Sequence, residues 1–102
     1  MLNVLWFEPD DGAQKYAEYA AAAAPYVEKY GGRLIESYVP ETALIGEWNP
    51  DLLFVVEWPS WEAFLELPAD EGYMKVAHLR EEAITNSLLI KCRAGFELDL
   101  PG

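Results

Sequence analysis

Apolar residues alternate with polar ones, or run unbroken, in four short segments of the chain, as in β-strands. Between these segments, apolar residues recur every three or four positions, as on one face of a helix. The pattern therefore predicts strands at residues 2–7, 33–39, 52–58 and 86–93, and helical segments at residues 13–30, 61–67 and 71–84. The order along the chain is βαββαβ, with the second helical region split.

Polar residues, glycines and prolines indicate where the helices begin and end. Asp11 is expected to cap the start of the first helix. Gly31 and Gly32 are expected to stop it. Pro25 lies inside this helix and is expected to kink it, or to break it and open a second short helix, because proline lacks a backbone N–H donor. Pro68 is expected to interrupt the next helical segment.

This order of elements is that of the ferredoxin-like α+β fold, in which a four-stranded antiparallel sheet carries its helices on one face. The strand order is then 4-1-3-2. Strand 52–58 fits a central position because it is apolar on both faces, while strands 33–39 and 86–93 carry charges, as edge strands do. The alternating residues 96–100 would add a short strand. Residues 1–102 are expected to form a single domain.

The helices can cover only one face of such a sheet, and the other face would leave leucine, valine and aromatic side chains in water. Burying each of these side chains contributes ~1.5–3 kcal/mol. An exposed apolar patch of that kind usually marks an interface. The simplest cover is a second copy of the chain, packed sheet on sheet about a two-fold axis. We therefore expect a homodimer.

Charge and composition exclude several classes of partner. Eighteen acidic and seven basic residues give the chain a net charge of −11. Nucleic acid and membrane surfaces are not expected as partners, because both are bound through lysine and arginine. No secretory signal is recognisable at the start of the chain. Cys92 is the only cysteine, which excludes an internal disulfide and favours a cytoplasmic location. One histidine and one cysteine cannot build an ordinary zinc site, so no metal is expected, and no cofactor is expected either.

Residues 19–93 resemble an uncharacterised bacterial family, the domain of unknown function 1330. The more specific matches are the run KYGGR, the run GEWNPD followed by PS, and Tyr73 followed seven residues later by Arg80. The resemblance implies a dimeric α+β barrel and no established reaction. The chain departs from the family pattern at Asp70-Glu71-Gly72, where Ser-Pro-Glu is usual, and at Leu52, where arginine is usual.

One face of predicted helix 71–84 carries residues spaced four, three and four apart, namely Tyr73, Ala77, Arg80 and Ile84. Because this face is otherwise apolar, Arg80 is expected at least partly inside the protein. Its guanidinium would pair with a carboxylate such as Glu57 or Glu36. Alternatively, it would hold a carboxylate or enolate oxygen of a ligand, assisted by the Tyr73 hydroxyl.

Three further residues are candidates for the site. Glu57 projects from an otherwise apolar strand, and Trp58 covers the end of that strand, where it would contact a ligand. His78 is either exposed or a general base. The stretch EWPSWEAF…YMKVAHLR also resembles haem-degrading monooxygenases of the same barrel class, which implies an axial-ligand role for His78. Those enzymes also need a tryptophan near the position of Leu67 and an asparagine on the first strand, where Asn3 lies.

Three hypotheses about function follow. The preferred one is a cytoplasmic homodimer that binds, or transforms without a cofactor, a small apolar or anionic molecule between helices and sheet. Arg80, Tyr73 and Trp58 would bind the molecule, and His78 and Glu57 are the catalytic candidates. The second hypothesis is a haem-degrading or cofactor-free monooxygenase that uses His78. The third is a non-catalytic structural or regulatory dimer with a fully packed interior.

Overall fold

A computed structural model describes residues 1–93 of the chain. The elements are β1 (Leu2–Phe7), α1 (Gly12–Lys29), β2 (Arg33–Tyr38), β3 (Leu52–Glu57), α2 (Trp61–Ala69), α3 (Glu71–Met74), α4 (Ala77–Ala83) and β4 (Ile84–Ile90). The strands form one antiparallel sheet in the order β2-β3-β1-β4. The predicted ferredoxin-like α+β fold and its strand order are therefore confirmed. The strand predicted at residues 96–100 lies outside the described residues.

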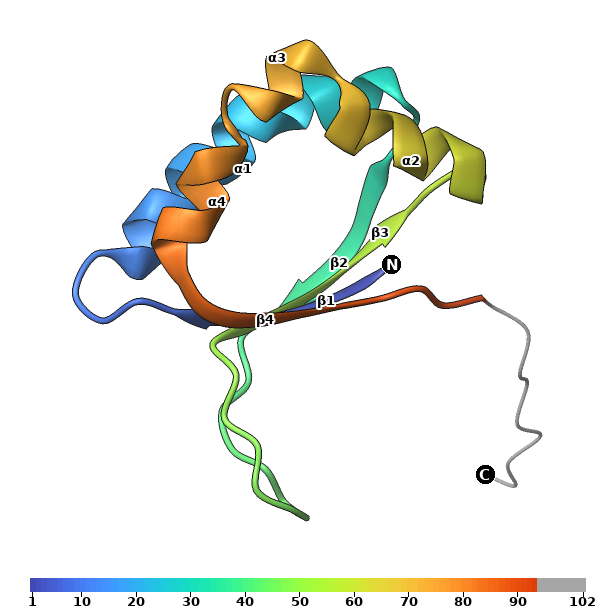
Figure 1. The fold of residues 1–102 in the computed structure, drawn as a ribbon. Helices are drawn as coiled ribbons and strands as arrows, with labels where there is room; N and C mark the ends of the chain where they lie inside the picture. The colour runs from blue at the N-terminus through green and yellow to red at the C-terminus, as the bar shows by residue number, and fades with distance from the viewer. Residues whose placement is uncertain (94–102) are drawn as a thin grey trace, which may run out of the picture.

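The helices lie on one side of the sheet, as predicted. Figure 1 shows α1 to α4 arching over one face, while the connection between β2 and β3 extends away on the other side. This connection, residues 39–51, has no helix or strand and is called the arm below. Leu44 and Ile45 near its tip are 92% and 97% exposed.

Alternation along the strands gives the sheet two different faces. The covered face, toward the helices, carries Asn3, Leu5, Phe7, Phe54 and Ser87. The open face carries Val4, Leu53, Val55, Leu88 and Ile90. The core on the covered face is built from Leu5 on β1, tyrosines and an alanine on α1, and Ala83 at the end of α4.

The first helix has the predicted length of 18 residues but begins and ends one residue earlier than predicted. It runs unbroken through Pro25, so the predicted break does not occur. The carbonyl that Pro25 leaves without an N–H partner belongs to Ala21, which is exposed and can bond to water. Asp11 precedes the helix but makes no capping hydrogen bond, and its carboxylate lies 3.6 Å from the Lys15 ammonium instead.

The glycine stop at the end of α1 has the predicted form. Gly31 adopts a φ of 84°, a left-handed conformation that glycine tolerates best. The N–H groups of Gly31 and Gly32 donate to the carbonyls of Glu28 and Val27, at 3.0 and 2.9 Å. This pair of bonds is the Schellman arrangement, which satisfies carbonyls that a helix end leaves without partners.

The second helical region differs from the prediction in two ways. Pro68 lies inside α2, one residue before its end, and does not interrupt it. The predicted helix 71–84 is divided into α3 and α4. At the division, the N–H groups of Val76 and Leu79 donate to carbonyls three residues earlier, the tighter pattern of a 3₁₀ turn. In Figure 1 the divided helices form an arc that follows the curved sheet.

The fourth strand begins two residues earlier than predicted and ends at Ile90 rather than at residue 93. It begins early because α4 ends at Ala83 and the chain enters β4 directly, without a loop. The second and third strands each end one residue before the predicted limit.

The open face is rich in apolar side chains that reach solvent. Tyr38, Leu88 and Ile90 are 54%, 39% and 42% exposed. At one end of this face, Trp48 and Asn49 of the arm contact Trp6 of β1. The ring of Trp48 lies edge-on to Trp6 at 5.7 Å between centroids, and the Trp6 indole N–H donates to the Asn49 side chain at 3.2 Å. Among the helices of residues 1–93, none has the length and apolar character that crossing a membrane requires.

Candidate functional site

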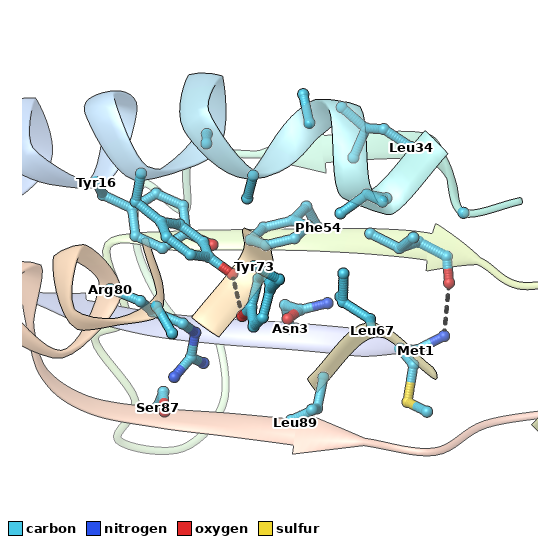
Figure 2. Close-up of a pocket in the computed structure, with 18 of the residues that line it drawn as sticks. Met1, Asn3, Tyr16, Leu34, Phe54, Leu67, Tyr73, Arg80, Ser87 and Leu89 are labelled. Carbon is cyan, nitrogen blue, oxygen red and sulfur yellow. Dashed lines mark hydrogen bonds between the residues drawn. The ribbon is translucent and has the colours of Figure 1, made fainter. Parts of the chain in front are cut away.

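A cavity of about 990 Å³ lies between the helices and the covered face of the sheet. This volume is at the upper end of the range of roughly 300–1,000 Å³ typical of small-molecule sites. One wall is α1, which contributes a row of small side chains: Ala13, Ala17, Ala20, Ala23 and Ala24. Side chains of all four strands complete the lining, and Figure 2 shows Asn3, Phe54, Ser87 and Leu89 among them.

Arg80 provides a cation at one end of the cavity. It is half-buried in the last turn of α4, and Figure 2 shows its guanidinium pointing into the cavity toward Ser87. None of the ion pairs found among residues 1–93 involves Arg80. Glu57, the predicted structural partner, instead pairs with Arg33 at 2.9 Å, and both side chains of that pair are largely exposed. The predicted ion pair between Arg80 and Glu57 is therefore wrong.

Three tyrosines surround the same end of the cavity. The hydroxyls of Tyr19 on α1 and Tyr73 on α3 are hydrogen-bonded at 2.7 Å. Burial raises the pKa of Tyr16 to about 12, although the nearby Arg80 guanidinium acts in the opposite direction. Burial, and next the hydrogen bond to Tyr73, raise the pKa of Tyr19 well above its ordinary value. Tyr16 and Tyr19 therefore stay neutral near pH 7 and supply no negative charge to Arg80.

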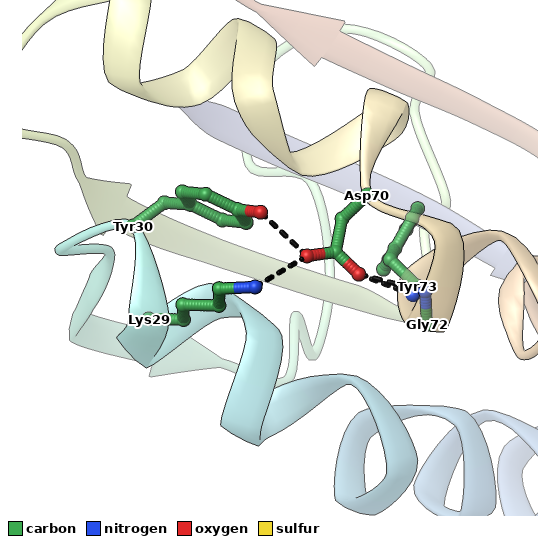
Figure 3. Close-up of polar contacts among 5 residues, drawn as sticks. All are labelled: Lys29, Tyr30, Asp70, Gly72 and Tyr73. Atoms are coloured by element: carbon green, nitrogen blue, oxygen red, sulfur yellow. Dashed lines mark hydrogen bonds and ion pairs between the residues drawn. The ribbon is translucent and has the colours of Figure 1, made fainter.

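The position of Tyr73 is fixed by Asp70, the residue before α3. Figure 3 shows that one carboxylate oxygen of Asp70 accepts from the backbone N–H groups of Gly72 and Tyr73, at 2.8 and 3.0 Å. The other oxygen accepts from the Lys29 ammonium at 2.9 Å and from the Tyr30 hydroxyl at 2.5 Å. Asp70 thus joins the end of α1 to the start of α3 above the cavity.

These contacts also set the charge state of Asp70. The hydrogen bonds from Tyr30, then those from Lys29 and the Tyr73 backbone, hold the pKa of Asp70 far below its ordinary value. The carboxylate is therefore ionised at every pH near neutrality. Gly72 permits the close approach of α3 to α1, because a Cβ at this position would lie 2.5 Å from the ring of Tyr26 on α1.

The other end of the cavity is apolar. It is lined by Val27 at the end of α1, Val56 and Trp58 at the end of β3, and Phe64 and Leu67 of α2. The rings of Trp58 and Phe64 meet edge-on at 5.3 Å. The cavity therefore has a polar end, formed by Arg80, the three tyrosines and Ser87, and an apolar end near Trp58.

Three of the five predicted site residues line this cavity and two do not. Tyr73 and Arg80 lie at the polar end, and Trp58 lies at the apolar end. Glu57 is exposed, and its side chain belongs to the open face of the sheet. His78 is also exposed and is not among the lining residues. The structure therefore brings the predicted binding residues to one cavity, but it does not place the two catalytic candidates beside them.

Tyr16, Tyr19 and Ser87 at the polar end were not predicted as part of the site, and Asn3 was named only through the resemblance to haem-degrading enzymes. Two signals could have indicated them. Tyr16 and Tyr19 are three residues apart and therefore share a helix face, on which two hydroxyls are unusual among alanines. Asn3 alternates with Leu5 and Phe7, so an amide faces the core side, where it is 9% exposed. Residues 1–93 contain no group of three or more histidine, cysteine or acidic side chains placed to hold a metal ion.

Comparison with known proteins places the chain in a family of unknown function. A family described as "Domain of unknown function (DUF1330)" matches residues 9–91. The crystal structure of RPA0582, a protein of unknown function from Rhodopseudomonas palustris, is 30% identical in sequence, with a TM-score of 0.88 over 94% of this chain and 81% of that chain. A structure of methylated RPA0582 is 29% identical, also with a TM-score of 0.88, over 93% and 78% of the respective chains. No curated protein matches the chain.

Proposed function

The chain belongs to the DUF1330 family, and from the geometry of the cavity we propose that it binds a small, mainly apolar molecule with an anionic group. The observation that carries this proposal is the Arg80 guanidinium, which points into an apolar cavity and is not part of any ion pair among residues 1–93. A charge removed from water is stable only when it is paired and hydrogen-bonded. A carboxylate or enolate oxygen of a ligand would supply that partner.

The groups around Arg80 suit an anion. The hydroxyls of Tyr73 and Ser87 can each donate a hydrogen bond to an oxygen held by the guanidinium. Arginine binds planar carboxylates through two parallel hydrogen bonds, which fixes the orientation of the ligand as well as its charge. Asp70 keeps Tyr73 in position without approaching the cavity as a competing carboxylate, because its oxygens are engaged by α1 and α3.

The alternatives have less support. A haem-binding role for His78 requires its imidazole to face the cavity, and His78 is exposed. A packed, purely structural interior is hard to reconcile with about 990 Å³ of space beside Arg80. No side chain in the cavity combines a nucleophile or base with a partner that would activate it, so the proposal is limited to binding.

The open face supports a second part of the proposal, a homodimer. Its leucine, isoleucine and tyrosine side chains remain 39% to 54% exposed in one chain, and a second copy packed on the same face would cover them. The covered face, with its cavity, would stay clear of that interface. We place this homodimer in the cytoplasm, consistent with a single cysteine and an acidic chain.

The experiment is a calorimetric titration of the protein with octanoate and benzoate. The wild-type protein should bind at least one of these carboxylates, and Arg80→Leu should weaken that binding by about 10–100-fold, the range for losing a charge-assisted hydrogen bond. Arg93→Leu is the matched control, because it removes an exposed arginine that does not line the cavity and should leave the affinity unchanged. Failure of the wild type to bind either carboxylate, or equal affinity in Arg80→Leu, would contradict the proposal.

A further inference from the structure

We propose that the ligand is a straight-chain aliphatic carboxylate, with its head group on Arg80 and its hydrocarbon tail lying under α1 toward Trp58. This inference rests on the proposed function and adds the shape of the ligand to it. The first observation is the length of the cavity. Between Tyr16 at the polar end and Val27 at the apolar end, the lining follows α1 for eleven helical steps, about 16 Å at the helical rise. The lining extends along β3 from Leu52 to Trp58, about 20 Å at the rise of a strand.

The second observation is the separation of polar and apolar groups along this length. Arg80, Tyr73 and Ser87 gather at one end, as Figure 2 shows, and Leu67, Leu34 and Met1 lie toward the other. Beyond the tyrosines, α1 presents the methyl groups of alanines and then Val27 and Glu28, and the strands present side chains such as Val56 and Leu89. A compact aromatic acid would fill the polar end and leave most of this apolar length in contact with water.

The third observation concerns the cations at the apolar end. Arg33 borders the cavity there, but its guanidinium is paired with Glu57 at 2.9 Å. The amino group of Met1 donates to the Val56 carbonyl at 2.7 Å. Both groups are already engaged, and Glu28, which also borders this end, is negative. The charges therefore favour a ligand with one anionic head and a neutral tail over a dicarboxylate.

The fourth observation is apolar surface that a tail would cover. Leu34 lines the cavity on β2 and is nevertheless 60% exposed. Ala20 and Ala24 face the same opening from α1 and are also exposed. A hydrocarbon tail between α1 and β2 would remove these side chains from water, and affinity should then grow with the number of methylenes that it buries.

The test compares butyrate, hexanoate, octanoate and decanoate with benzoate by calorimetry on the wild-type protein. The affinity should rise with chain length, by up to about fourfold for each buried methylene, and decanoate should bind more tightly than benzoate. An affinity that does not depend on chain length, or a preference for benzoate, would overturn this inference while leaving the proposed function intact. Failure of every carboxylate to bind would overturn both.

Two cavity variants and one surface control test where the hydrocarbon tail of the ligand lies. Ala24→Phe should obstruct the apolar end and weaken decanoate binding by more than about tenfold while leaving butyrate binding unchanged, because butyrate does not reach so far. Ala21→Phe adds the same ring to an exposed position of α1 that does not line the cavity and should change neither affinity. Val56→Phe obstructs the same end from β3 and should reproduce the effect. An equal loss for both ligands in the two cavity variants would contradict the assignment of the tail.

Discussion

The two faces of the sheet differ in chemistry although they alternate along the same strands. The covered face combines apolar side chains with polar groups such as Asn3 and Ser87. It borders the cavity into which the Arg80 guanidinium points. The open face is apolar at its centre, with Val4, Leu53 and Leu88 on neighbouring strands. A mainly apolar face with a few polar groups suits a small ligand, while a uniformly apolar face suits a second protein surface. Two residues that are adjacent in a strand can therefore face a small-ligand site on one side of the sheet and a protein surface on the other.

Adjacent leucines on β4 give the sharpest test of this difference. Leu88→Glu would place a carboxylate on the open face and should weaken the proposed homodimer by at least about 100-fold, because each copy would bury an unpaired charge. Leu89→Glu changes the neighbouring residue, which lines the cavity, and should preserve the dimer while weakening carboxylate binding by repulsion. Sedimentation velocity measures the first effect and calorimetry the second. A wild-type protein that sediments as a monomer at micromolar concentration would refute the division of roles.

The next prediction concerns the helices above the covered face. Asp70→Asn should lower the melting temperature at pH 7 by several degrees, because a carboxylate that joins α1 to α3 loses its charge. The pKa of Asp70 is lower in the folded chain than in the unfolded one. Its contribution to stability is therefore present above the unfolded value of about 3.9 and is lost as the pH falls toward the folded value.

The difference in melting temperature between wild type and Asp70→Asn should accordingly shrink as the pH is lowered from 5 toward 2. Thermal unfolding followed by circular dichroism at several pH values measures it. Asp11→Asn is the control, because the Asp11 carboxylate is exposed and lies 3.6 Å from Lys15. A difference for Asp70→Asn that is independent of pH would show that the loss comes from geometry rather than charge.

The smallest expected effect is an absence of pH dependence at the polar end. Because burial raises the pKa of Tyr16 to about 12, the Tyr16 hydroxyl should not form a phenolate that competes for Arg80 at moderately alkaline pH. The affinity for octanoate should therefore be constant between pH 7 and pH 9.5 in calorimetric titrations. A decline across this range that disappears in Tyr16→Phe would show that Tyr16 ionises more readily than its burial implies.

Most of the fold could be predicted from the sequence, because strand alternation and helix periodicity report directly which side of each element is buried. The errors fell at proline and at helix ends. Pro25 and Pro68 were expected to interrupt helices, yet both are exposed, where water can replace a missing backbone partner. The division between α3 and α4 has no proline or glycine at Lys75–Val76 that would mark it in the sequence.

The site was only partly predictable, for a different reason. Tyr73 and Arg80 were recognised because their spacing places them on one side of a helical segment, and they still line one cavity although that segment is divided. Glu57 was misplaced because a charged residue on an apolar strand was taken to face a cavity, whereas alternation sends it to the open face beside Arg33. The cavity itself depends on how far α1 stands from the sheet, a tertiary distance that residue patterns do not contain.

The absence of a loop between α4 and β4 limits how the segment that carries Arg80 can evolve. Arg80 and Ser87 face each other at the polar end and are separated by a short stretch that turns directly from helix to strand. One inserted or deleted residue in this stretch would exchange the two faces of the later part of β4, so that Leu88 would face the cavity and Leu89 would face outward. Such a change would damage the proposed ligand site and the proposed dimer interface together, so natural variants should accumulate substitutions here but conserve the number of residues.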